Sequence, residues 1–151
     1  MNQNQKLLKI LREELILMHK ASDALKRSWH ECQSIRKDKI SSEEVMDRLE
    51  LLSSRFSRLT DFMIQRIFRL IDEIDLDPSG TVRDVINRSE KKGLIDNADV
   101  FIQARILRNR IAHEYVERVM NEIFDETIRL VPAVLDSVLR TDAYVKKYGT
   151  I

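Results

Sequence analysis

Residues 45–74 read VMDRLELLSSRFSRLTDFMIQRIFRLIDEI. Apolar residues recur in this segment at steps of three and four, the spacing that places side chains on one face of an α-helix. The members of this stripe are Val45, Leu49, Leu52, Phe56, Leu59, Met63, Ile67, Leu70 and Ile74. At 1.5 Å per residue such a helix measures roughly 45 Å, longer than a compact domain of this size is wide. We therefore expect a long amphipathic helix that either bends or offers one end to a partner chain.

The segment before this helix has the same periodicity. One stripe predicts a first helix of about six turns and consists of Leu7, Leu11, Leu15, Met18, Ala21 and Leu25. The basic segment 33–39 breaks the pattern and is predicted to connect the two helices. Ser41 and Glu44 have the spacing of a capping box, so we expect the second helix to begin there.

Three further helices are predicted after the long one. Thr81 and Asp84 begin a short helix that Gly93 ends as a C-cap, and a fourth helix begins near Asp96 or Asn97. The fourth helix is expected to bury Val100, Ala104, Leu107 and Ile111. The last helix contains Pro132 as a kink, and its apolar face consists of Met120, Ile123, Phe124, Ile128, Val131, Leu135 and Val138. A short polar tail is expected over residues 141–151.

Composition agrees with an all-α fold. The 151 residues include only 3 Gly and 2 Pro, with 43% hydrophobic and 34% charged residues. Few turn residues and many amphipathic segments favour long helices over a many-stranded sheet, and this length suits a single domain. We predict one domain over residues 1–151, an antiparallel bundle of four long helices plus one short helix.

Charge and cysteine content limit the class of protein. Lys and Arg total 26 against 25 Asp and Glu, a net charge of +1, so any attraction to a polyanion must be local. The single cysteine, Cys32, excludes an intramolecular disulfide and fits a reducing compartment. The polar N-terminal run and the lack of a long apolar stretch predict a soluble, cytoplasmic protein with no membrane segment.

The segment that carries chemistry is Arg108-Asn109-Arg110-Ile111-Ala112-His113-Glu114-Tyr115. Arginine is a permanently charged, forked donor suited to phosphate, and histidine exchanges protons near neutral pH. Cleavage of RNA by side chains alone needs a base for the 2′-hydroxyl, an acid for the departing 5′-oxygen and positive charge near the phosphorane. Arg108 and His113 are therefore the candidate catalytic residues.

This segment resembles the Arg-Asn-x-x-x-His-x-Tyr signature of HEPN domains, in particular HepT-type toxins encoded beside a minimal nucleotidyltransferase antitoxin. The flanking residues 87–94 and 104–107 and the following helix also look like HEPN sequence, so the resemblance covers about the C-terminal half of the chain. It implies a HEPN-like helical fold and a metal-independent endoribonuclease toxin that acts as a homodimer. It also implies that the antitoxin silences the toxin by transferring a nucleotide to Tyr115.

Helix geometry bears on how the motif works. In a regular helix Arg108 and His113 lie about 140° apart around the axis and do not converge on one phosphate. Either the helix breaks near His113, or the arginine of one chain works with the histidine of another. A dimer also supplies the two histidines that an acid and a base require. Asn109, four residues before His113, shares its face and is expected to orient the imidazole.

Other residues near the motif have supporting roles. Tyr115 can donate a hydrogen bond to phosphate as well as accept a nucleotide. Arg105, Arg110 and Arg118 form with Arg108 a modest basic patch over residues 105–118, suited to contacting an RNA backbone without reading its sequence.

A non-catalytic alternative stays open. Some HEPN relatives are regarded as nucleotide- or substrate-binding partners of nucleotidyltransferases, and this chain could be such a subunit. No cofactor is expected, and no metal site either, because His30 and Cys32 lack a second pair of ligands at suitable spacing. Trp29 is predicted to pack at the end of the first helix with its indole N–H on a carbonyl or water.

Overall fold

A computed structural model describes residues 1–35, 42–114 and 117–149, the side chains of residues 117 and 118 excepted. All regular secondary structure in these ranges is helical, which confirms the all-α prediction. The helices are α1 (Gln3–Gln33), α2 (Glu43–Phe62), the π-helical turn η2 (Met63–Phe68), α3 (Arg69–Ile74), α4 (Val82–Lys92), α5 (Ala98–His113), α6 (Glu117–Val145) and the 3-10 turn η3 (Lys146–Tyr148). α2, η2 and α3 follow one another without a break and form the long helix that the apolar stripe predicts.

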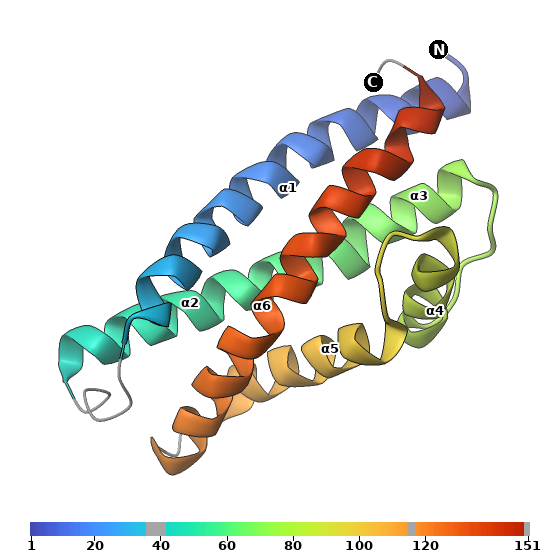
Figure 1. Ribbon diagram of the computed structural model, residues 1–151. Coiled ribbons are helices and arrows are strands. Elements are labelled where there is room, and N and C mark those ends of the chain that lie inside the picture. The colour runs from blue at the N-terminus through green and yellow to red at the C-terminus, as the bar shows by residue number, and fades with distance from the viewer. Residues whose placement is uncertain (36–41, 115–116, 150–151) are drawn as a thin grey trace.

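The long helices pack as an antiparallel bundle (Figure 1). α1 runs antiparallel to α2, and α5 runs antiparallel to α6, while α4 lies beside the far end of the long helix. Buried residues from α1 to α6 form one apolar core, in which Phe56, Phe68, Phe101 and Phe124 are among the largest fully buried side chains. None of the described helices is long and apolar enough to cross a membrane.

The first helix is longer than its stripe of leucines suggests. It begins with a capping box between Asn2 and Gln5 and continues to Gln33, so the predicted connection from residue 33 begins where the helix ends. The remaining part of that connection lies outside the described residues. Near the end of α1 the Trp29 indole N–H donates to the carbonyl of Ile128 at 3.2 Å, which confirms its predicted role and ties α1 to α6.

The second helix begins one residue later than predicted. Its N-cap is Ser42, whose hydroxyl accepts from the Val45 amide at 3.2 Å, whereas Ser41 lies outside the described residues. The reciprocal half of a capping box cannot form from Val45, because its side chain has no acceptor. The carboxylate of Glu44 instead accepts from Arg48, one turn further on, at 2.9 Å.

The long helix changes register at η2. A π turn holds one residue more than an α turn, so the apolar face is rotated after it. Phe68, the last residue of the turn, and Ile71 beyond it are fully buried. Leu70 and Ile74, which α-helical spacing assigns to the apolar stripe, are only partly buried. The wide turn lets the helix follow the core rather than run straight past it.

The caps of α4 and α5 form within a few residues of each helix end. Thr81 and Asp84 form the predicted capping box, and Gly93 ends α4 in a left-handed conformation with φ of 80°. Asn97 caps α5 through a bond from the Val100 amide at 3.1 Å. These three predictions are confirmed.

The C-terminal segment is not the simple polar tail that its composition suggests. α6, which contains Pro132, runs to Val145 and continues as η3. Thr141 is fully buried, and the hydroxyls of Tyr144 and Tyr148 donate to the carboxylate of Asp75 at 2.5 and 2.6 Å. The tail is therefore attached to the end of α3 by side chains that sequence periodicity does not reveal.

Asp75 is the centre of a compact ionic group, the Asp75 cluster, formed by Asp72, Asp75, Lys92, Tyr144 and Tyr148. Lys92 donates to Asp72 at 2.8 Å and to Asp75 at 2.9 Å. Burial by itself would raise the pKa of Asp75, but hydrogen bonds from Lys92, Tyr144 and Tyr148 outweigh it and lower that pKa to about 2. Burial together with the bond to Asp75 raises the pKa of Tyr148 above its ordinary value. The cluster joins α3, α4, α6 and η3.

Candidate functional site

The motif residues Arg108, Asn109 and His113 lie in the last two turns of α5. The helix ends at His113, after which Glu114 adopts an extended conformation with φ of −96° and ψ of 135°. Its amide still donates to the carbonyl of Arg110 at 3.0 Å. Tyr115, the predicted modification site, lies outside the described residues, as does the side chain of Arg118.

Arg108 faces the long helix. Its Nε donates to Oδ2 of Asp61 at 2.6 Å, and Nη1 of Arg105, one turn earlier, lies 3.3 Å from Oδ1 of the same carboxylate. All three side chains are about one-third exposed, with relative areas of 28–32%. One carboxylate thus holds two guanidinium groups between α2 and α5, and a net positive charge remains.

His113 lies on a different side of α5. Because both residues belong to the regular helix, the separation of about 140° around the axis applies, and Arg108 and His113 do not converge within one chain. His113 is exposed, as are Ile106 and Asn109, which lie on the same side of the helix. A regular helix therefore directs Arg108 and His113 to different sides.

Asn109 does not make the predicted bond to His113 in the described part of the chain. Its Oδ1 instead accepts from Nη1 of Arg108 at 3.4 Å. The amide of Asn109 therefore binds the guanidinium of Arg108 and leaves the imidazole of His113 exposed.

Arg110 points toward α6 rather than toward Arg108. Its guanidinium lies 3.4 Å from Glu126 and 3.9 Å from Glu122. Two residues along a helix rotate a side chain by about 200°, which accounts for the opposite direction. Among the arginines predicted to contact RNA, Arg105 shares a surface with Arg108 and Arg110 does not.

The basic surface includes two arginines outside the predicted patch over residues 105–118. Arg58 and Arg66 project from α2 and η2 into the groove that Arg105 and Arg108 border, and Asp61, Phe62 and Gln65 line the same groove of about 520 Å³. We call it the arginine groove. Arg66 is held by the buried Glu14 of α1 at 2.7 Å. Asp61 and Glu14 offset part of the charge of the four guanidinium groups, and the lining stays basic.

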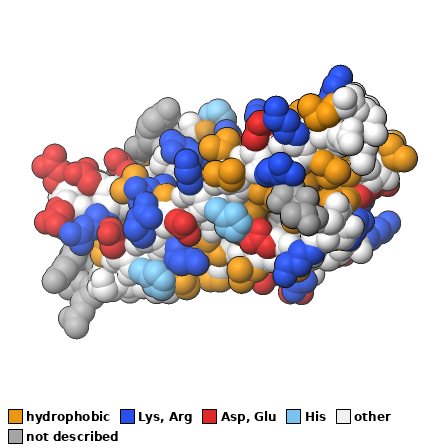
Figure 2. Space-filling view, turned by 90° about the horizontal axis from the view of Figure 1, so that it is seen from above, with side chains coloured by type: hydrophobic (Ala, Val, Ile, Leu, Met, Phe, Trp, Pro, Cys, Tyr) orange, Lys and Arg blue, Asp and Glu red, His pale blue; other side chains and the backbone are white. Residues whose placement is uncertain are grey.

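The charge elsewhere is mixed. The face shown in Figure 2 alternates Lys and Arg with Asp and Glu, and hydrophobic side chains are scattered among them. A chain with a net charge of +1 has no general attraction for a polyanion, so the arginine groove is the kind of local feature that could supply it.

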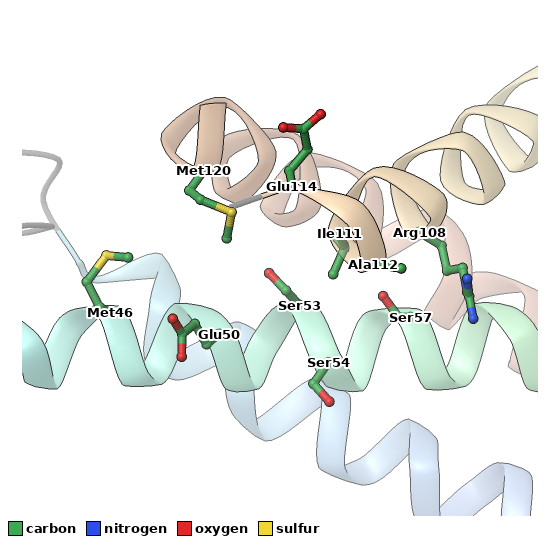
Figure 3. Close-up of a pocket in the computed structure, with 10 residues that line it drawn as sticks. All are labelled: Met46, Glu50, Ser53, Ser54, Ser57, Arg108, Ile111, Ala112, Glu114 and Met120. Atoms are coloured by element: carbon green, nitrogen blue, oxygen red, sulfur yellow. The ribbon is translucent and has the colours of Figure 1, made fainter. Parts of the chain in front are cut away.

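A second hollow adjoins the arginine groove at Arg108. This serine cavity, of about 530 Å³, lies between α2 and α5 and is bordered by Ser53, Ser57, Ile111 and Met120, among others. The side chains of Ser53 and Ser57 are directed from α2 toward α5, whereas Ser54 points away (Figure 3). Arg108 therefore belongs to both hollows.

The two residues considered as metal ligands, His30 and Cys32, lie near the end of α1. Cys32 is 1% exposed, and burial raises the pKa of its thiol. The ring of His30 lies 5.3 Å from that of Trp29. Within the described residues no group of three or more His, Cys, Asp or Glu side chains is placed to hold a metal ion.

Comparison with known proteins found no matching family model, no matching curated protein and no matching solved structure.

Proposed function

We propose that this protein is a HEPN-type, metal-independent endoribonuclease toxin that acts as a homodimer. The observation that carries the proposal is the arginine groove, which extends the motif arginine into a basic surface large enough for a nucleic-acid backbone. Arg108 holds the phosphate next to the scissile bond in this mechanism. The neighbouring arginines position the strand without reading its bases.

The chemistry follows from two histidines in one shared cleft. His113 of one chain removes the proton from the ribose 2′-hydroxyl, whose oxygen attacks the phosphorus. His113 of the second chain donates a proton to the departing 5′-oxygen. The products are a 2′,3′-cyclic phosphate and a 5′-hydroxyl, and the guanidinium groups stabilise the charge that develops on the phosphorane.

The proposed dimer pairs through the exposed side of α5. Ile106, which is apolar and 55% exposed, lies on this side together with Asn109 and His113. Two α5 helices paired antiparallel about a two-fold axis near Asn109 would place His113 of one copy opposite Arg105 of the other, because both residues are four positions from Asn109. Such pairing brings the imidazole of one copy toward the groove of the other.

In this proposal a minimal nucleotidyltransferase antitoxin controls the enzyme by modifying Tyr115. An added nucleotide carries negative charge and bulk, which would oppose the binding of RNA phosphate. The support for this step is the sequence resemblance.

The test is RNA cleavage by purified protein in EDTA, with analysis of the product ends. We expect 2′,3′-cyclic phosphate ends, and we expect His113→Ala to lose cleavage while keeping the helical circular dichroism spectrum. His19→Ala is the matched control, because that histidine is half exposed and pairs with Asp142 on another face. Equal cleavage by the parent and by His113→Ala would remove the mechanism.

A second candidate function is a non-catalytic subunit that binds a nucleotidyltransferase and its nucleotide. The observation in its favour is that Asp61 already satisfies both Arg105 and Arg108 in the single chain. This alternative predicts tight complex formation with a minimal nucleotidyltransferase, no RNA cleavage and no growth arrest when the protein is expressed alone.

A further inference from the structure

The serine cavity is built like a small-molecule site. Its volume of about 530 Å³ lies in the range of ligand pockets. Met46, Ile111, Ala112 and Met120 supply apolar walls. Methionine side chains are flexible and polarisable, so they adapt well to a flat ring.

Two buried hydroxyls point into this cavity and have nothing to bind. Ser53 is 3% exposed, and the Oγ atoms of Ser53 and Ser57 have no hydrogen-bond partner in the described part of the chain. Figure 3 shows both on the side of α2 that faces α5. Burying a hydroxyl without a partner lowers stability. The hydroxyls of Thr60 and Thr141 are also unpartnered among the described residues, but those of Ser53 and Ser57 border a cavity in which a polar ligand can bind both.

The two ends of the cavity differ in charge. Arg108 borders one end, and although its Nε binds Asp61, a guanidinium has five donors and can still bind an anion. Glu50 borders the other end, near Met46 (Figure 3). Glu50 and Ser57 are separated by roughly 10 Å along the helix axis. An elongated ligand with an anion at one end and a hydrogen-bond donor at the other fits this arrangement.

We infer that the serine cavity binds one nucleoside monophosphate unit. Its phosphate lies at Arg108, its base lies among Met46, Ile111 and Met120, and the hydroxyls of Ser53 and Ser57 bind polar atoms of the ribose or the base edge. The unit can be a free nucleotide or one residue of a single-stranded RNA. Only the second source rests on the proposed function.

The test measures binding of each of the four 5′-ribonucleotides to the full chain by calorimetry. We expect at least one nucleotide to bind more tightly than inorganic phosphate, and we expect Ser53→Ala and Ser57→Ala each to weaken that binding about threefold to tenfold. Ser79→Ala is the matched control, since Ser79 is exposed and does not border the cavity. The inference is overturned if none of the four binds, if phosphate alone binds equally well, or if both serine variants bind like the parent.

A thermal measurement separates a ligand role from a structural one. Removing an unpartnered hydroxyl should raise the Tm of the free protein, by about 2 °C for Ser53→Ala, while it weakens nucleotide binding. A lower Tm in Ser53→Ala would show that the hydroxyl serves the fold and would also overturn the inference.

A second arm distinguishes the two nucleotide sources and keeps the two proposals apart. A 2′-O-methyl oligoribonucleotide cannot be cleaved through its 2′-oxygen, so its binding is independent of chemistry. If Ser53→Ala weakens both mononucleotide and oligonucleotide, the cavity holds a residue of RNA; if it weakens the mononucleotide alone, the ligand is a free nucleotide. Nucleotide binding without RNA cleavage would refute the proposed function alone, and cleavage without nucleotide binding would refute this inference alone.

Discussion

Replacing Asp75 by Asn should destabilise the protein by about 2 kcal/mol, because the Asp75 cluster stabilises the ionised carboxylate. The pKa of Asp75 falls from the ordinary 3.8 to about 2 in the folded protein. At about 1.4 kcal/mol per pKa unit, the ionised carboxylate contributes about 2 kcal/mol to folding. The side chain is only 13% exposed, so solvent screens these interactions little. A loss of this size leaves a domain of typical stability folded.

The pH dependence provides the sharper test. A carboxylate with a lowered pKa stabilises the fold fully above its unfolded pKa of 3.8, and that stability is lost as the pH falls through the folded pKa of about 2. Urea unfolding of the parent and of Asp75→Asn should therefore differ by about 2 kcal/mol at pH 7. The difference should shrink below about pH 4.

The control is Asp96→Asn, which changes the same chemical group at a site where Asp96 is 78% exposed and lies 3.3 Å from Arg140. An exposed ion pair contributes little, so we expect a change within about 0.5 kcal/mol at every pH. A difference between the parent and Asp75→Asn that stayed constant from pH 2 to pH 7 would refute the linkage argument. A difference no larger than that of the control would refute the importance of the cluster.

Three further predictions concern the groove, the dimer and a helix end. Arg66→Gln should weaken single-stranded RNA binding, measured by fluorescence anisotropy, and reduce the slope of log affinity against log salt by about 0.7. The control Arg129→Gln, at an arginine of α6 that is 63% exposed, should leave the slope unchanged. Ile106→Glu should convert a dimer to a monomer in sedimentation and abolish RNA cleavage without unfolding, because the side chain already lies in solvent; a folded, still dimeric variant would contradict the pairing proposed for α5. Gly93→Ala should cost about 1 kcal/mol in urea unfolding, since its φ of 80° disfavours a side chain although nothing lies within 4 Å of the added Cβ, and an unchanged midpoint would show that the C-cap relaxes.

Local chemistry explains which parts of the fold the sequence predicts. Thr81 with Asp84, Gly93 and Asn97 act within a few residues of themselves, so their roles as caps can be read from the chain alone. The helix stripes are similarly local, because burial repeats with the period of the helix. The sequence predicts Ser41 as the N-cap of α2 and the structure has Ser42, because two adjacent serines both satisfy the pattern of an N-cap.

Long-range pairs explain what the sequence does not predict. Asp61 and Arg108 are 47 positions apart, and nothing in either neighbourhood indicates that they meet. The same holds for Asp75 and Tyr148, separated by 73 positions. Arg58 and Arg66 become candidates for RNA contact only when the bundle brings α2 beside α5.

The wide turn at η2 determines which side of the long helix faces the core beyond it. Uninterrupted α-helical winding would place Leu70 and Ile74 on the buried stripe, whereas the observed winding buries Ile71 fully and leaves Leu70 and Ile74 partly buried against the core. Deleting one residue from this turn would therefore rotate α3 by about 100° around the helix axis relative to α2. The same deletion would rotate Asp75 away from Lys92, so the turn at η2 also positions the Asp75 cluster.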